Sequence, residues 1–196
     1  MKAFETPWQQ MILGGLCGIL NFIIGYSLKS LELPLFLDQI LIVTASFFGW
    51  CSGITSVIIH HILCSAIYFS ISLPDLLFSL CSFVTVVTIR LLFKKQETPT
   101  PAQLLFASLF LAVVISILGG IIITFITMYL NYIEDNSATT LARLLQHFQI
   151  SSVPAAILGR IPINLIDKTI AVFAGYGATF VIKELLRIFL SQNLKK

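Results

Sequence analysis

Charged side chains are scarce in this sequence. They make up 11% of the 196 residues, whereas a typical soluble domain carries about 25%. Hydrophobic residues account for 57% of the chain, and the mean hydropathy is +0.96. This deficit of charge excludes an ordinary cytosolic globular domain. It predicts one all-α integral membrane domain that occupies residues 1–196.

Motifs for nucleotide or metal chemistry are also missing. The sequence has no Gly-x-x-x-x-Gly-Lys-Ser/Thr loop for nucleotide phosphates. The four cysteines lie within or beside apolar runs, without the spacing of metal ligands or of a disulfide framework, and are interpreted as small apolar packing residues: Cys17, Cys51, Cys64 and Cys81. We therefore expect no enzyme activity, no cofactor, no metal and no nucleic-acid partner for this chain.

Apolar segments of membrane length recur along the sequence. A helix needs about 20 apolar residues to cross a bilayer, and six such spans are predicted at residues 8–28, 35–50, about 53–72, about 74–95, 102–132 and 153–190. A tight turn is predicted at Gly49–Gly53, because two glycines flank small and polar residues. A short amphipathic helix is predicted over 139–148, lying at the membrane interface.

Basic residues are unevenly divided between the two sides that six spans would create. One side holds both termini and most of the cations, namely Lys2, Arg90, Lys94, Lys95, Lys183, Arg187, Lys195 and Lys196. The other side holds Lys29 and Arg143, with Arg160 near its boundary. By the positive-inside rule, both termini are expected to be cytoplasmic.

Ionisable and amide side chains interrupt the apolar spans. Asp38 and Gln39 lie near the outer end of the second span, where burial of a carboxylate costs roughly 2.5–3.5 kcal/mol. Asn164, Asp167 and Lys168 are spaced i, i+3, i+4 in the last span, so they share one helix face.

Other polar residues fall at the same predicted depth. Asn21, Thr127 and Asn131 also belong to the outer half of their spans, which predicts a pocket that opens outward. The alternative left open is structural, with these groups pairing between helices to hold the bundle together. His60 and His61 are expected nearer the inner side, making interhelical hydrogen bonds rather than sharing a metal ion.

Gly14 and Gly18 form a small-x-x-x-small face on the first span. Such a face lets another helix approach closely. The pattern alone leaves two roles open, which are packing inside the chain and docking of a partner subunit.

Three short segments resemble the substrate-binding S components of energy-coupling factor (ECF) vitamin transporters. The first is Leu-Pro-Leu-Phe-Leu-Asp at 33–38, and the second is Phe48-Gly49-Trp50 through Gly53. The third is Ile163-Asn164-Leu165-Ile166-Asp167-Lys168-Thr169 in the last span. Cys51 departs slightly from the usual turn pattern, and Gly14 and Gly18 stand where many members have alanines.

This resemblance implies a membrane subunit that captures a vitamin or related micronutrient from outside. Its partners would be an energising transmembrane subunit and two cytoplasmic ATPases in a prokaryotic plasma membrane. Residues 33–38 would cap a pocket with Asn131, Asn164, Asp167 and Lys168 as candidates, and Gly14 and Gly18 would face the partner.

The residue types suggest how such a ligand would be held. Phe36, Tyr129 and Tyr132 offer aromatic faces for a heterocycle. Lys168 and Arg160 suit a carboxylate or phosphate, while Asp167 and Asn164 suit ring nitrogens. Asp38, on the cap, completes the predicted site.

Three other functions compete with this interpretation. A membrane sensor domain would need no energising partner. A self-contained secondary transporter often has repeated halves with broken helices, and no convincing internal repeat is found. An intramembrane enzyme needs a nucleophile and base or a metal at one depth, which His60, His61 and Asp75 do not provide.

Overall fold

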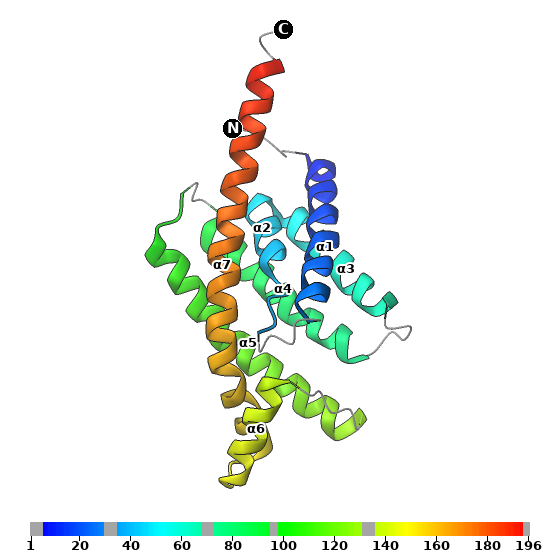
Figure 1. Cartoon of the computed structure of the whole chain (residues 1–196), viewed down its shortest axis with the longest axis vertical. Helices are drawn as coiled ribbons and strands as arrows, with labels where there is room; N and C mark the ends of the chain where they lie inside the picture. The colour runs from blue at the N-terminus through cyan, green and yellow to red at the C-terminus, as the bar shows by residue number, and fades with distance from the viewer. Residues whose placement is uncertain (1–5, 30–34, 68–72, 95–97, 131–135, 194–196) are drawn as a thin grey trace.

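The computed structural model describes residues 6–29, 35–67, 73–94, 98–130 and 136–193. Within these ranges the chain forms seven helices and no strand, as the composition predicts (Figure 1). The helices are α1 (Pro7–Lys29), α2 (Ile40–Phe48), α3 (Trp50–Ile67), α4 (Leu73–Phe93), α5 (Pro101–Leu130), α6 (Ser137–His147) and α7 (Ser152–Asn193).

Four of these helices are long and apolar enough to cross a membrane. They are α1, α4, α5 and α7, whose apolar stretches cover Pro7–Leu28, Leu76–Phe93, Pro101–Leu130 and Ser152–Leu185. Large apolar side chains such as Leu16, Leu91 and Phe106 lie exposed on their outer faces. A soluble protein rarely exposes so much contiguous apolar surface. The chain is therefore a multi-pass membrane protein.

The second predicted span is replaced by a half-helix. α2 has nine residues and rises about 13.5 Å, roughly half of a hydrocarbon core. Residues 36–39 before it carry no helical structure, and Leu37 has a φ of 46°. The span predicted as a helix over 35–50 is thus wrong in its first five residues.

The turn predicted over Gly49–Gly53 is reduced to one residue. Gly49 is extended, with φ 169° and ψ 171°, and Trp50 already begins α3. A Cβ on Gly53 would lie 2.7 Å from Val86 Cγ1. Gly53 is therefore needed for the close approach of α4, whereas Gly49 alone breaks the helix.

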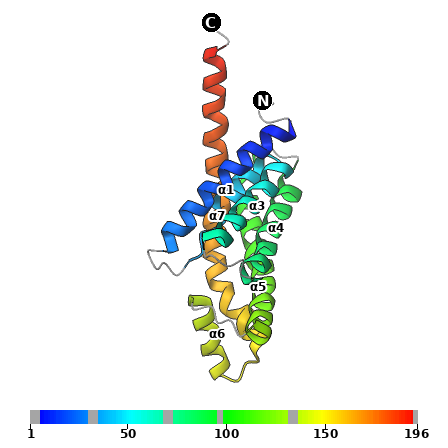
Figure 2. The same ribbon diagram turned by 90° about the vertical axis from the view of Figure 1, so that its right-hand side faces the viewer.

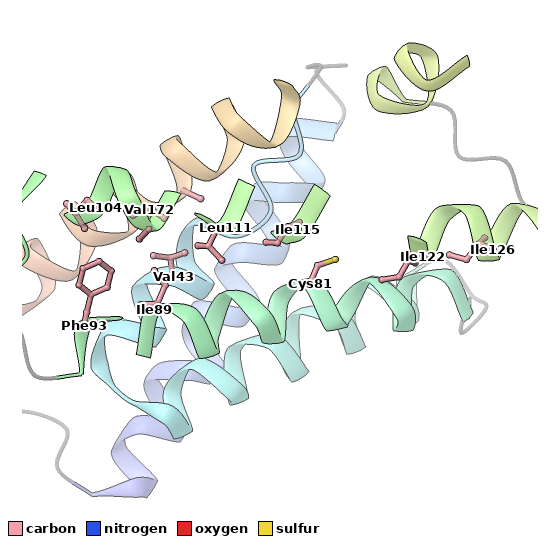
Figure 3. Close-up of a cluster of buried hydrophobic side chains, with 12 residues drawn as sticks. Val43, Cys81, Ile89, Phe93, Leu104, Leu111, Ile115, Ile122, Ile126 and Val172 are labelled. Carbon is pink, nitrogen blue, oxygen red and sulfur yellow. The ribbon is translucent and has the colours of Figure 1, made fainter. Parts of the chain in front are cut away.

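α2 is enclosed by the rest of the bundle. It contacts α1, α3, α4 and α7, and all of Ile42–Ser46 is buried. Val43 belongs to a core cluster with Ile89 of α4, Leu111 of α5 and Val172 of α7 (Figure 3). The largest apolar core is therefore built around α2 and along α4 and α5.

α7 is much longer than a bilayer requires. Its 42 residues rise about 63 Å, and its C-terminal part extends beyond the other helices (Figures 1 and 2). Pro162 lies within this helix, where proline removes one backbone donor. α6 packs against α7 at the opposite end of the molecule, and a helix close to the predicted 139–148 is confirmed.

Gly14 and Gly18 of α1 pack against α3 of the same chain. A Cβ on Gly14 would lie 2.9 Å from Ser52 Cα, and one on Gly18 would lie 2.7 Å from the Ser56 carbonyl oxygen. Of the two roles left open by the sequence, the structure supports packing within the chain. The expectation that this face meets a partner subunit is corrected, because α3 already covers it.

Replacing Gly14 by alanine should destabilise the bundle, because the new methyl group has no space beside the α3 backbone. We expect the free energy of unfolding to fall by about 1–3 kcal/mol, as for other overpacked sites. Gly15→Ala is the matched control, since nothing lies within 4 Å of its Cβ position. Thermal unfolding in detergent compares the two variants, and equal midpoints would contradict the packing.

Candidate functional site

The amino end of α2 lies inside the bundle, where its first N–H groups need partners. Asn21 of α1 supplies one, because its Oδ1 accepts the Leu41 N–H at 3.0 Å. Asn21 Nδ2 donates to the carbonyl oxygen of Asp38 and also lies 3.2 Å from Nδ1 of His60. One amide side chain thus ties the start of α2 to α1 and α3.

Gln39 connects the same point to α4. Its Oε1 accepts a hydrogen bond from the Thr85 hydroxyl at 2.7 Å. Ser82, one turn earlier on α4, lies 3.5 Å from Gln39 Nε2 and 3.0 Å from His61 Nε2 of α3. The polar groups of four helices therefore meet in one layer.

Asp167 of α7 holds the non-helical segment before α2. Its Oδ1 accepts the Leu37 N–H at 2.6 Å, and its Oδ2 accepts from Lys168 Nζ at 2.6 Å. Asp167 and Lys168 are only 0% and 2% exposed, respectively. Leu37 has a left-handed backbone that costs an L residue roughly 1–2 kcal/mol. Asp167 therefore offsets local strain as well as the buried charge of Lys168.

Asn164 and Arg160 extend the polar layer along α7. Asn164 Nδ2 donates to the Ser116 hydroxyl of α5 at 2.9 Å. The Arg160 guanidinium lies over the Phe78 ring of α4, 5.5 Å from its centroid. The Arg160 stem passes beside Gly119, whose Cβ position lies 3.5 Å from Arg160 Cδ.

These side chains surround a cavity of about 90 Å³, which we call the inner cavity. Its lining combines two cations, one carboxylate, two amides, two phenyl rings and one imidazole. The residues are Phe36, Asp38, Gln39, His61, Phe78, Cys81, Ile115, Gly119, Arg160, Asn164 and Lys168. Asp38 Oδ1 is buried without a hydrogen-bond partner among the described residues. The inner cavity can therefore hold a small polar molecule that both donates and accepts hydrogen bonds.

Five predicted site residues line the inner cavity together: Phe36, Asp38, Arg160, Asn164 and Lys168. Asp167 lies behind them, bonded to Lys168 and to the Leu37 backbone. Tyr129 does not join them, because it is 72% exposed and packs against Phe125 with ring centroids 4.8 Å apart. Its expected role against a heterocycle therefore stays a prediction that the inner cavity does not support. Asn131 and Tyr132 lie outside the described residues.

The inner cavity contains residues that the sequence did not single out as binding residues. Gln39, Phe78, Cys81 and Gly119 line it, and so does His61, which was expected nearer the inner side. The structure instead places both histidines at the level of Gln39. Counted from Gly49, Gln39 and His60 are 10 and 11 residues away in opposite directions, so two helices joined there return the histidines to the level of Gln39. The predicted interhelical bonds of both histidines are confirmed.

Within the described part of the chain, no three His, Cys, Asp or Glu side chains are grouped closely enough to hold a metal ion. Comparison with protein-family models, with curated proteins and with solved structures finds no match for this chain. The similarity to ECF S components thus rests on the short motifs at 33–38, 48–53 and 163–169.

Asp167→Asn should destabilise the protein strongly, because the amide still accepts from Leu37 but no longer balances the Lys168 charge. Breaking a buried ion pair on one side costs about 3–5 kcal/mol. The double variant Asp167→Asn/Lys168→Met should recover most of this loss, since no buried charge is left uncompensated. Thermal unfolding of the single and double variants in detergent measures the coupling. Additive effects would contradict a buried pair.

Proposed function

We propose that this chain is the substrate-binding subunit of an ECF-type importer in a prokaryotic plasma membrane. It would capture a vitamin or related micronutrient from outside and deliver it through a separate energising module. The observation that carries the proposal is the inner cavity, where Asp38 meets the buried side chains of Asn164 and Lys168 inside an apolar bundle. Ionisable groups at membrane depth are expensive and usually serve function.

Six membrane crossings fit the helix lengths. α3 has 18 residues and rises about 27 Å. α2 and the non-helical residues 35–39 together extend about 30 Å, if the latter run at roughly 3.3 Å per residue. The bilayer core is about 30 Å thick. In this proposal the half-helix and the segment before it form the second crossing.

The distribution of cations supports an orientation. The end of the molecule at which α4 and α7 finish carries Arg90, Lys94, Lys183 and Arg187. The end with α6 carries Arg143, and Arg160 is buried near it. By the positive-inside rule the first end is cytoplasmic, so the segment 35–39 covers the inner cavity from the outside.

The lining of the inner cavity suits a planar polar nutrient. Phe36 and Phe78 offer aromatic faces, while Gln39 and Asn164 carry amides that both donate and accept. A ligand lacking a matching group would leave buried polar atoms unpaired, which makes such a site selective. A cavity of about 90 Å³ is smaller than the 300–1,000 Å³ of usual ligand sites. The inner cavity therefore holds a small ligand or one part of a larger ligand.

ATP hydrolysis would belong to two cytoplasmic ATPases, coupled through an energising transmembrane subunit. This subunit does not dock on the Gly14–Gly18 face, which α3 covers. The lipid-exposed side of α1, with Leu16, Leu20 and Ile23, remains for this contact.

A membrane sensor domain is the second candidate function. The favouring observation is α7, whose C-terminal part extends past the other helices (Figure 2). A continuous helix can transmit a displacement at Asp167 or Lys168 to a domain outside the membrane. Such a protein would bind a ligand in the same cavity but would not associate with ATPases.

The proposed topology predicts opposite accessibility for two exposed positions. In a background with all four cysteines replaced, Phe148→Cys should react with a membrane-impermeant maleimide in intact cells, and Thr98→Cys only after permeabilisation. Both residues are exposed. Thr98 lies just before the start of α5, and Phe148 lies just after the end of α6. Labelling of both from the same side would contradict a membrane crossing by α5, and the reverse pattern would contradict the orientation.

A bound nutrient should be found by mass spectrometry of small molecules that co-purify with the protein. Asn164→Ala and Asp38→Asn should reduce its occupancy at least tenfold, because the first removes an amide and the second replaces a carboxylate acceptor by an amide inside the inner cavity. Ser108→Ala is the control, since Ser108 is buried on α5 and bonds only within its own helix. Co-purification of ATPases with the wild type distinguishes importer from sensor. A nutrient retained equally by all variants would contradict the site.

A further inference from the structure

A second, larger pocket lies between α5, α6 and α7. We call it the outer pocket; its volume is about 260 Å³. α5 contributes two apolar side chains and two threonines to its lining, and α6 and α7 contribute arginine, amide and hydroxyl groups. The residues are Ile123, Thr124, Thr127, Met128, Ala138, Thr139, Ala142, Arg143, Gln146, Ser152, Ala156 and Arg160.

Close packing of α6 on α7 forms this pocket. A Cβ on Gly159 would lie 2.8 Å from both the Ala138 carbonyl oxygen and the Ala142 N. Only glycine at position 159 allows α6 to approach α7 this closely. Thr139, Arg143 and Gln146 then follow at spacings of four and three residues, which places them on one face of α6 toward the pocket.

The Arg160 side chain lies between the inner cavity and the outer pocket, because it lines both of them. It is 5% exposed. Its stem passes Gly119 and its guanidinium stacks over Phe78. A guanidinium cannot be deprotonated in proteins and presents a planar fork that matches a carboxylate or phosphate.

We propose that the inner cavity and the outer pocket form one binding site for an elongated anionic ligand. Its polar ring occupies the inner cavity, and its carboxylate or phosphate lies in the outer pocket on Arg160, with Arg143 as the second cation. This inference rests on the proposed function and names the ligand's chemical class. The inner cavity alone is too small for most ligands, whereas the joined compartments come within the usual range of roughly 300–1,000 Å³.

Inorganic phosphate is the probe for the acidic subsite. Isothermal titration of the full chain, purified in a maltoside detergent without phospholipid, should detect phosphate binding. Arg160→Gln should weaken this binding at least tenfold, and Arg160→Lys less. Arg143→Gln should weaken it several-fold; Arg143 is exposed on α6, so its replacement keeps the test valid if Arg160→Gln does not fold.

Arg187→Gln is the matched control, because Arg187 is 65% exposed on α7 and pairs only with Glu184 among the contacts observed. Its phosphate affinity should equal that of the wild type. Equal affinities in Arg160→Gln, Arg143→Gln and Arg187→Gln, or no phosphate binding by the wild type, would overturn the inference.

A phospholipid headgroup offers the same chemistry, since α6 lies at the end of the bundle. Phosphatidylglycerol titrated into the phosphate-bound protein distinguishes the sources. Failure to displace phosphate supports a soluble ligand, whereas displacement that depends on Arg160 assigns the pocket to lipid and overturns the inference. A co-purified nutrient that depends on Asn164 but carries no acidic group would overturn the inference while leaving the proposed function intact.

Discussion

The start of a helix inside an apolar bundle is the constraint on which the rest of the structure depends. α2 begins at Ile40, surrounded by α1, α4 and α7. Unpaired N–H groups there would cost several kcal/mol each in hydrocarbon. Asn21 satisfies this end, and Arg90 NH1 donates to the carbonyl oxygens of Ser46 and Phe47 at the other end. Both ends of the half-helix are therefore completed by side chains of neighbouring helices.

The polar groups that complete α2 are next to those that line the inner cavity. Gln39 bonds to Thr85 and also lines the inner cavity. Lys168 pairs with Asp167 and lines the same cavity. Structural and binding roles are therefore not alternatives here, although the sequence presented them so. A half-helix in a bundle requires a polar layer, and the proposed binding site is a small void within that layer.

The long elements were predictable because length and hydropathy decide them: α1, α4, α5 and α7 match their predicted spans closely. The i, i+3, i+4 spacing also placed Asn164 and Lys168 on one face correctly. The break before α2 was not predictable, since its strained residue is Leu37 rather than a glycine, and its partner Asp167 lies 130 positions away. That break shortened α2 to nine residues.

Under the proposed function, Asp167 would connect ligand binding in the inner cavity to the position of residues 35–39. Its two oxygens bond the Leu37 N–H and the Lys168 ammonium. An ammonium has three donors, so an anionic ligand beside Lys168 can bind without displacing Asp167. Such a ligand would hold Lys168 in place and thereby keep Asp167 aimed at Leu37. A ligand that contacts Lys168 only while residues 35–39 cover the cavity would favour that covered conformation. Because Leu37 is strained, loss of the ligand leaves less interaction energy to keep residues 35–39 in position.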